Sequence, residues 1–244
     1  MDDQGAHQVV VVGDSSVGKM DLVRVMGGQE FCLAVDYRPN SADVDEVARS
    51  VDGREVHMQT HHVTAGECYD QLRGLSYKGA RVIVLCYRVD QPTSLENLRT
   101  FWLPEIKEKI PSDAPHPGMI VVGTMADLRL SRDARLEQLA GSKSLPREVR
   151  MPGGVCDEEA EVIQEKEVAI NASVPEYALS IVPEAAGDLV PMSEGEALAS
   201  EIGAAYIECS ALSYAGVDEL LDACAKACIA PPPAASSNRR CALQ

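Results

Sequence analysis

Near its N-terminus the chain reads Gln8-Val9-Val10-Val11-Val12-Gly13-Asp14-Ser15-Ser16-Val17-Gly18-Lys19-Met20, and this stretch decides the fold. Gln8–Val12 is a short apolar run of the kind found in strands that are buried on both faces of a parallel sheet. Residues 17–27 then have the pattern of a helix. A strand, a glycine-containing loop and a helix in direct succession bring backbone N–H groups to a helix N-terminus, where anions bind.

The loop fits the P-loop pattern G-x-x-x-x-G-K-[S/T] at every position but the last, where Met20 replaces the hydroxyl residue. The two glycines allow a tight turn whose N–H groups converge on phosphate oxygens, and Lys19 supplies a positive charge to the β- and γ-phosphates. The sequence therefore predicts a phosphate-binding loop made of Gly13, Asp14, Ser15, Ser16, Val17, Gly18, Lys19 and Met20.

The rest of the chain alternates between strand-like and helix-like segments. Two strand-like runs within 44–62 surround Asp52-Gly53, a strong signal for a two-residue hairpin. Further strands are expected at 81–87, 119–123 and 205–209, and further helices at 93–110 and 214–229. Because strands that alternate with helices form mostly parallel sheets, we predict an α/β fold: a doubly wound, mostly parallel six-stranded sheet with helices on both faces.

Charge is distributed unevenly along the chain. Its 244 residues include 22 Lys and Arg against 38 Asp and Glu, so the net charge is −16. A chain this negative does not bind nucleic acid through a broad basic surface. Eleven acidic residues and one basic residue fall within 151–200. We interpret about 130–190 as an acidic insertion into a domain spanning 1–230, although a solvated acidic surface loop would have the same composition. A flexible Pro/Ser tail is expected at 231–244.

Beyond the P-loop, the chain resembles the Ras superfamily, and most closely its Rho/Rac branch. The segments that carry the resemblance stand in the family's order: Val63-Thr64-Ala65-Gly66-Glu67, residues 69–77, Ser94-Leu95-Glu96-Asn97, Trp102-Leu103-Pro104-Glu105-Ile106, residues 122–129 and Glu208-Cys209-Ser210-Ala211-Leu212. The resemblance covers about 8–130 and 191–230. It implies a P-loop G domain that binds GTP and GDP, and an insertion before the last part of the domain is itself a Rho feature.

The resemblance also implies the residues that meet the nucleotide outside the P-loop: Phe31, Ala65, Gly66, Thr124, Met125, Asp127, Ser210, Ala211 and Leu212. Asp127 would accept hydrogen bonds from the N1–H and the exocyclic amine of guanine. Met125 stands where the family has a Lys that covers the ring and braces the P-loop, so the cover remains and the brace is lost. Phe31 is the candidate for the aromatic residue at the edge of the base.

Three positions implied for Mg²⁺ are altered together. The family's P-loop hydroxyl becomes Met20, its switch I Thr becomes Asn40 and its switch II Asp becomes Val63. A thioether suits soft metals, and a valine coordinates nothing, so Asn40 is the one remaining candidate ligand. We expect weakened Mg²⁺ binding. Tyr37, Pro39 and Asn40 form the implied switch I surface for Rho-type effectors or regulators, none of which we specify.

Catalysis is expected to be impaired. The family's Gln orients the attacking water, and here either Glu67 replaces that Gln or the Gln is deleted. A glutamate could accept a hydrogen bond from water, but its charge would repel the γ-phosphate.

Two hypotheses about function follow. The protein is a guanine-nucleotide switch with slow or absent hydrolysis, or it is a pseudo-GTPase that serves as a membrane-tethered interaction scaffold. A P-loop kinase or ATPase is disfavoured by the guanine-type residues Thr124, Asp127 and Ser210.

The C-terminal residues Cys241-Ala242-Leu243-Gln244 fit the C-a-a-X pattern, whose final Gln favours transfer of a farnesyl group to the cysteine. We therefore expect lipidation of Cys241 and a peripheral location on the cytoplasmic face of a membrane. One lipid binds membranes only marginally, and Arg239-Arg240 is a small basic patch. No apolar run is long enough to span a membrane, and the N-terminus carries no secretory signal.

Overall fold

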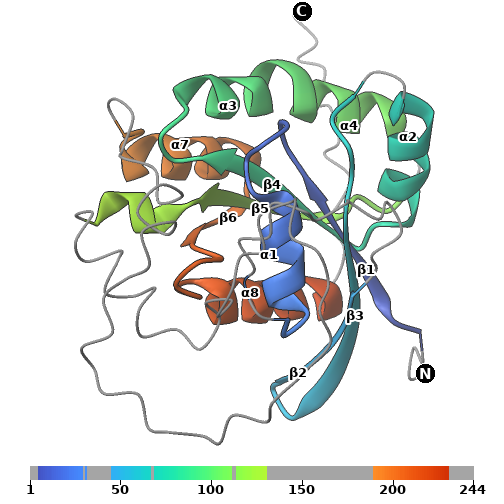
Figure 1. Ribbon diagram of the computed structural model, residues 1–244. Helices are drawn as coiled ribbons and strands as arrows, with labels where there is room; N and C mark the ends of the chain where they lie inside the picture. The colour runs from blue at the N-terminus through green and yellow to red at the C-terminus, as the bar shows by residue number, and fades with distance from the viewer. Residues whose placement is uncertain are drawn as a thin grey trace, which may run out of the picture.

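The computed structural model describes residues 5–29, 31, 45–66, 69–111, 114–130 and 189–230. Its sheet has six strands in the order β2-β3-β1-β4-β5-β6 (Figure 1). The strands are β1 (His7–Val12), β2 (Asp45–Val51), β3 (Arg54–His62), β4 (Val82–Arg88), β5 (Gly118–Thr124) and β6 (Ala205–Cys209). β2 pairs antiparallel with β3, and every other pairing is parallel. The predicted doubly wound, mostly parallel sheet is confirmed.

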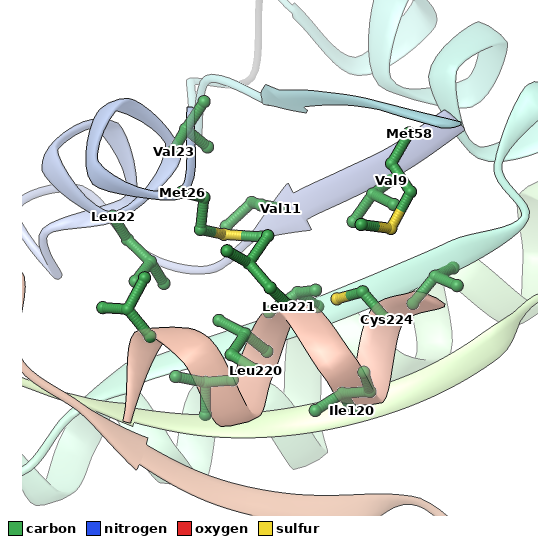
Figure 2. Packing of buried hydrophobic residues seen from close by; sticks show 14 of the residues in the cluster. Val9, Val11, Leu22, Val23, Met26, Met58, Ile120, Leu220, Leu221 and Cys224 are labelled. Atoms are coloured by element: carbon green, nitrogen blue, oxygen red, sulfur yellow. The ribbon is translucent and has the colours of Figure 1, made fainter. Parts of the chain in front are cut away.

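Helices cover both faces of this sheet. They are α1 (Lys19–Met26), α2 (Asp70–Gly79), α3 (Pro92–Asn97), the π-helical segment η2 (Leu98–Trp102), α4 (Leu103–Lys109), the 3₁₀ turn η3 (Ala126–Arg129), α7 (Met192–Ile202) and α8 (Val217–Ile229). Apolar residues of α1 and α8 share one buried cluster with the sheet (Figure 2). Residues of α2, α3, η2, α4 and α7 belong to a second cluster. Adjacent residues of a strand belong alternately to the two clusters, which shows that the clusters lie on opposite faces of the sheet.

Strand β1 shows how the alternation works. Val9 and Val11 belong to the α1/α8 cluster, whereas Val10 and Val12 belong to the other cluster, and all four are fully buried. Successive side chains of a strand point to opposite faces. A strand that has helices on both sides is therefore apolar throughout, which is why the run at 8–12 predicted a central strand.

The hairpin between β2 and β3 turns at Asp52 and Gly53, whose φ angles are 51° and 75°. Two consecutive positive φ values match the turn that Asp-Gly favours. The helix expected over 17–27 begins only at Lys19, because Gly18 is left-handed with a φ of 78°. The helix expected over 93–110 is observed as α3, η2 and α4 in direct succession.

Two helices, α2 and α7, were not predicted from the sequence pattern. The expected insertion at 130–190 and the expected tail at 231–244 fall almost entirely outside the described residues. Across the part of the chain that the structure describes, no helix is both long and apolar enough to cross a bilayer.

Candidate nucleotide-binding site

The P-loop connects the end of β1 to the start of α1, as the sequence predicted. Gly13 has a φ of 142°, and a Cβ at this position would lie 2.2 Å from the carbonyl oxygen of Cys86 in β4. Any side chain would therefore collide with the neighbouring strand. Gly18 directly precedes the helix in a left-handed conformation that L-residues rarely adopt. Both glycines of the pattern are thus required by the backbone itself.

Lys19 is buried at the base of this loop, where its Nζ donates a hydrogen bond to the carbonyl oxygen of Asp14 at 2.5 Å. Burial lowers the pKa of Lys19, and the Asp14 carboxylate partly counteracts that effect. A phosphate group at the loop would place an anion beside the amine and favour its charged form. Lys19 is therefore positioned for phosphate binding as the motif implies.

The side chain of Asp14 accepts hydrogen bonds from two residues of the continuous segment formed by α3 and η2. Its Oδ1 accepts a hydrogen bond from Trp102 Nε1 at 2.8 Å, and its Oδ2 accepts one from Asn97 Nδ2 at 2.6 Å. Ser15 and Ser16 follow at the exposed tip, and Ser16 has a positive φ of 62°. The motif places Asp14 in the loop but does not reveal its partners, because they lie more than eighty positions away in the chain.

The expected base-recognition residues come together at the ends of β5 and β6. The Thr124 Oγ1 lies 2.7 Å from the carbonyl oxygen of Val17, which ties β5 to the P-loop. Asp127 is 8% exposed, and its Oδ1 accepts a hydrogen bond from Ser210 Oγ at 2.6 Å. The Ser210 hydroxyl in turn accepts a hydrogen bond from the backbone N–H of Ser213. This loop, which includes the half-buried Ala211 and Leu212, thus fixes the orientation of the Asp127 carboxylate.

Met125 lies near the P-loop. It adopts a left-handed conformation with a φ of 57°, and its Cε lies 3.6 Å from the position that a Cβ on Gly18 would take. The side chain at this position is therefore beside the loop but carries no charge that could brace it. Phe31 lies beside the Ser210 loop, since its backbone N–H donates to the Tyr214 hydroxyl at 2.7 Å. The Phe31 side chain packs against the α1/α8 cluster.

The two described magnesium positions carry no oxygen in their side chains. Met20 is half-buried in the first turn of α1. Val63 is 6% exposed within the second apolar cluster, and its backbone N–H donates to the carbonyl oxygen of Val11 at 3.0 Å. Within the described ranges, no three His, Cys, Asp or Glu side chains gather as a metal site would require. These residues do not fit the hard, oxygen-seeking Mg²⁺ ion.

Asp21, one position after Met20, is an acidic residue near the loop that the P-loop pattern does not include. Burial raises its pKa, and Arg24 partly opposes this effect. Ala65 and Gly66 follow Val63 and are half-buried. Glu67, Tyr37, Pro39, Asn40 and Cys241 lie outside the described residues, so the structure neither supports nor contradicts their expected roles.

Comparison with known proteins agrees with this geometry. The model of the Ras family matches residues 8–230. The Rho-related GTP-binding protein RhoB of Homo sapiens is 36% identical over 142 residues, which cover 57% of this chain and 67% of that protein. The RhoB proteins of Mus musculus and Rattus norvegicus match to the same extent. The P-loop, the buried Asp127–Ser210 pair and these matches together show that the chain belongs to the Ras family, as a Rho-like small GTPase.

Proposed function

We propose that this protein binds GTP and GDP as a Rho-type switch with weakened Mg²⁺ binding and slow or absent hydrolysis. The observation that carries the proposal is the Asp127 carboxylate, which is 8% exposed and held by the Ser210 hydroxyl. Guanine presents two adjacent donors, its N1–H and its exocyclic amine, and a fixed carboxylate can accept from both. Adenine presents no such pair, which supports guanine as the base.

The proposed weakness toward Mg²⁺ rests on Met20 and Val63. A Met offers only a soft thioether, and Val63 lies in the apolar cluster where a carboxylate would need to be desolvated. The proposed slow hydrolysis rests on Glu67, because a carboxylate near the γ-phosphate would raise the cost of bringing negative charges together. In this chain Asn40 is the candidate for the remaining oxygen ligand.

A second candidate function is a scaffold that keeps the fold without turning nucleotide over. Met20 supports it, because a thioether replaces the hydroxyl that would hold Mg²⁺ against the phosphates. Val63 supports it as well, because an apolar residue cannot link switch II to the γ-phosphate through a metal ion. Effectors or regulators of the Rho type would then recognise a single conformation of the switch surfaces.

The nucleotide content of the purified protein separates the two functions. We expect chromatography of the denatured protein to release GDP or GTP, and labelled GDP to bind with an affinity that Mg²⁺ changes little. Met20→Thr is expected to make GDP binding more dependent on Mg²⁺, because it restores a hydroxyl ligand. Met20→Val is the matched control, since it has the shape of Thr but no hydroxyl. An empty protein that shows no saturable GDP binding would exclude the switch.

The specificity for guanine is tested at Asp127. Asp127→Asn replaces one acceptor oxygen by a donor, so we expect GDP to bind about 10- to 100-fold more weakly, the value of a charge-assisted hydrogen bond. Competition with ADP gives the control, because ADP should displace labelled GDP poorly in the unchanged protein. Equal competition by ADP and GDP would contradict the assignment of Asp127.

We also propose that Cys241 carries a farnesyl group and holds the protein on the cytoplasmic face of a membrane. The sequence supports this through the C-a-a-X pattern alone. Labelled farnesyl should be incorporated into the unchanged chain by a farnesyltransferase and not into Cys241→Ser. Incorporation into both chains, or into neither, would contradict the proposal.

A further inference from the structure

Arg73 of α2 contacts the segment that begins switch II. Its Nη1 donates hydrogen bonds to the backbone carbonyl oxygens of Thr64 and Gly66, at 3.2 and 2.7 Å. These two residues flank Ala65, directly after β3 and Val63. One guanidinium nitrogen therefore holds both ends of this short stretch.

The same guanidinium is paired inside the protein with Glu105 of α4. Arg73 Nε lies 2.8 Å from Glu105 Oε1, and Arg73 Nη2 lies 2.6 Å from Glu105 Oε2. The Tyr77 hydroxyl donates to Glu105 Oε1 at 2.8 Å. Arg73 is 2% exposed and Glu105 is 8% exposed. A buried two-point pair of this kind fixes the plane of the guanidinium, so the Arg73 contacts with Thr64 and Gly66 have little freedom.

Trp102 fixes the other side of Arg73. The Arg73 Cζ lies 5.6 Å from the centroid of the Trp102 ring, and the Trp102 Nε1 donates to Asp14 in the P-loop. Trp102 ends the π-helical segment, five positions after Asn97. A π-turn brings residues five apart onto one side of a helix, which explains how both side chains reach the same carboxylate.

We propose that Arg73 is a positioning residue that holds Thr64–Gly66 in one arrangement, whether or not a nucleotide is bound. A ligand shifts a segment only through interactions that differ between the segment's two states. Val63 lies in the apolar cluster and offers a metal-bound phosphate no such interaction. Only Ala65 and Gly66 of this stretch are then left to contact a nucleotide, and the Gly66 carbonyl oxygen is already held by Arg73. Arg73 is itself held by Glu105 of α4 and by Trp102. These contacts lie within the protein and do not depend on a nucleotide. This inference rests on the proposed function only where nucleotide-loaded states are compared.

Hydrogen exchange of the full chain tests the proposal at two amides. The Val63 N–H donates to the Val11 carbonyl oxygen, and the Tyr69 N–H donates to the Gly66 carbonyl oxygen, both at 3.0 Å. When GDP or a non-hydrolysable GTP analogue is added to the unchanged protein, each amide should change its exchange rate by no more than about twofold relative to the amides of β4, because ligand binding slows all amides that exchange by global unfolding by the same factor. Arg73→Lys, which keeps the charge but loses the fork, should speed both about tenfold or more in every state.

Two variants in η2 control for a general loosening of the segment from α3 to α4. Trp102→Phe keeps a ring against Arg73 but removes the donor to Asp14, so it should speed exchange in the P-loop and leave Val63 and Tyr69 unchanged. Arg99 lies in η2 like Trp102, and Arg99→Gln removes its exposed ion pair with Glu201 of α7. This change should alter the exchange of none of these amides. A substitution that only loosens the segment from α3 to α4 would speed amide exchange within that segment and leave the Val63 amide unchanged.

Several outcomes would overturn the inference. One is a tenfold change at Val63 or Tyr69, relative to the amides of β4, when nucleotide binds to the unchanged protein. Another is an effect of Arg73→Lys no larger than that of Arg99→Gln. Should Arg73→Lys fail to fold, Glu105→Gln weakens the same fork from its other side and is held to the same expectation. If GDP does not bind at all, the proposed switch function fails, whereas the comparison of nucleotide-free variants still decides the role of Arg73.

Discussion

Asp21 is a residue near the P-loop whose charge is disfavoured by its surroundings. It lies in the first turn of α1, where a helix N-terminus favours a negative charge. Burial nevertheless outweighs this and raises its pKa. The charged form of Asp21 is therefore less stable in the folded protein than in water, and it stands next to the loop that would receive phosphate.

We predict that Asp21→Asn raises the free energy of unfolding at neutral pH. A carboxyl whose pKa is raised by folding binds more protons in the folded state, so its cost to stability grows as the pH rises from the ordinary pKa of 3.8 through the raised pKa. The gain from Asp21→Asn should thus be present at pH 7 and vanish below about pH 3.8. Urea unfolding at several pH values measures it.

The matched control for this prediction is Asp222→Asn, an exposed position of α8. It should leave the free energy of unfolding at neutral pH unchanged. A gain for Asp21→Asn that persists with the same size at low pH would show that the effect does not come from titration of the carboxyl.

At the scale of the elements, packing of α7 on the sheet depends on Gly195. A Cβ added there would lie 2.3 Å from Tyr206 Cε2 and 2.6 Å from the Tyr87 hydroxyl. These two tyrosines hydrogen-bond each other at 2.8 Å, and Tyr206 also donates to Glu208 at 2.6 Å. The glycine therefore lets a helix approach a network of polar groups that has little freedom to move.

We predict that Gly195→Ala lowers the free energy of unfolding by about 1–3 kcal/mol, the usual cost of overpacking. This would occur although Ala is favoured over Gly inside a helix by about 1 kcal/mol. Gly79→Ala in α2 is the matched control, because its Cβ would meet only the flexible amide end of the exposed Gln8. Urea unfolding should show a loss for Gly195→Ala and none for Gly79→Ala; equal effects would contradict the packing argument.

At the scale of the whole molecule, the two described ends of the segment 131–188 lie close together. Arg129 pairs with Glu208 of β6 at 2.5 and 2.6 Å, and its Nη2 also donates to the Val190 carbonyl oxygen at 2.8 Å. The Val190 N–H donates to the Val89 carbonyl oxygen at 2.8 Å. The chain therefore leaves and rejoins the domain at one point, beside the base-recognition loop.

We predict that a linker of about six Gly and Ser residues can replace 131–188 without loss of GDP binding. Loop-closure entropy alone would raise the free energy of unfolding by about 2 kcal/mol when 58 residues are shortened to this length. GDP titration and urea unfolding of the shortened chain measure both quantities. A fall in either one would show that 131–188 contributes contacts to the domain.

The strands and the glycine loop could be predicted from the sequence because their causes are local. Continuous apolar runs mark strands buried on both faces, and all five strand regions were predicted to within one or two residues of their observed bounds. The Asp52-Gly53 turn and the two P-loop glycines follow from backbone conformations that few residues adopt. The family and the candidate base-reading residue Asp127 came from the same motifs, so they too belong to what the sequence by itself determined.

Only the tertiary structure decided what surrounds those motifs. The partners of Asp14, the fork between Arg73 and Glu105, and the burial of Val63 in the second apolar cluster arise between elements far apart in the chain. Helix α2 was missed because its burial runs against the usual pattern: Arg73 is buried, whereas Leu72 and Leu75 are exposed. Helix α7 was missed because it buries only Gly195, Leu198 and Ala199, a short apolar stripe. A motif records which side chains are present, whereas desolvation and hydrogen-bond partners depend on the neighbours that folding brings to them, and those neighbours set the charge and mobility of this site.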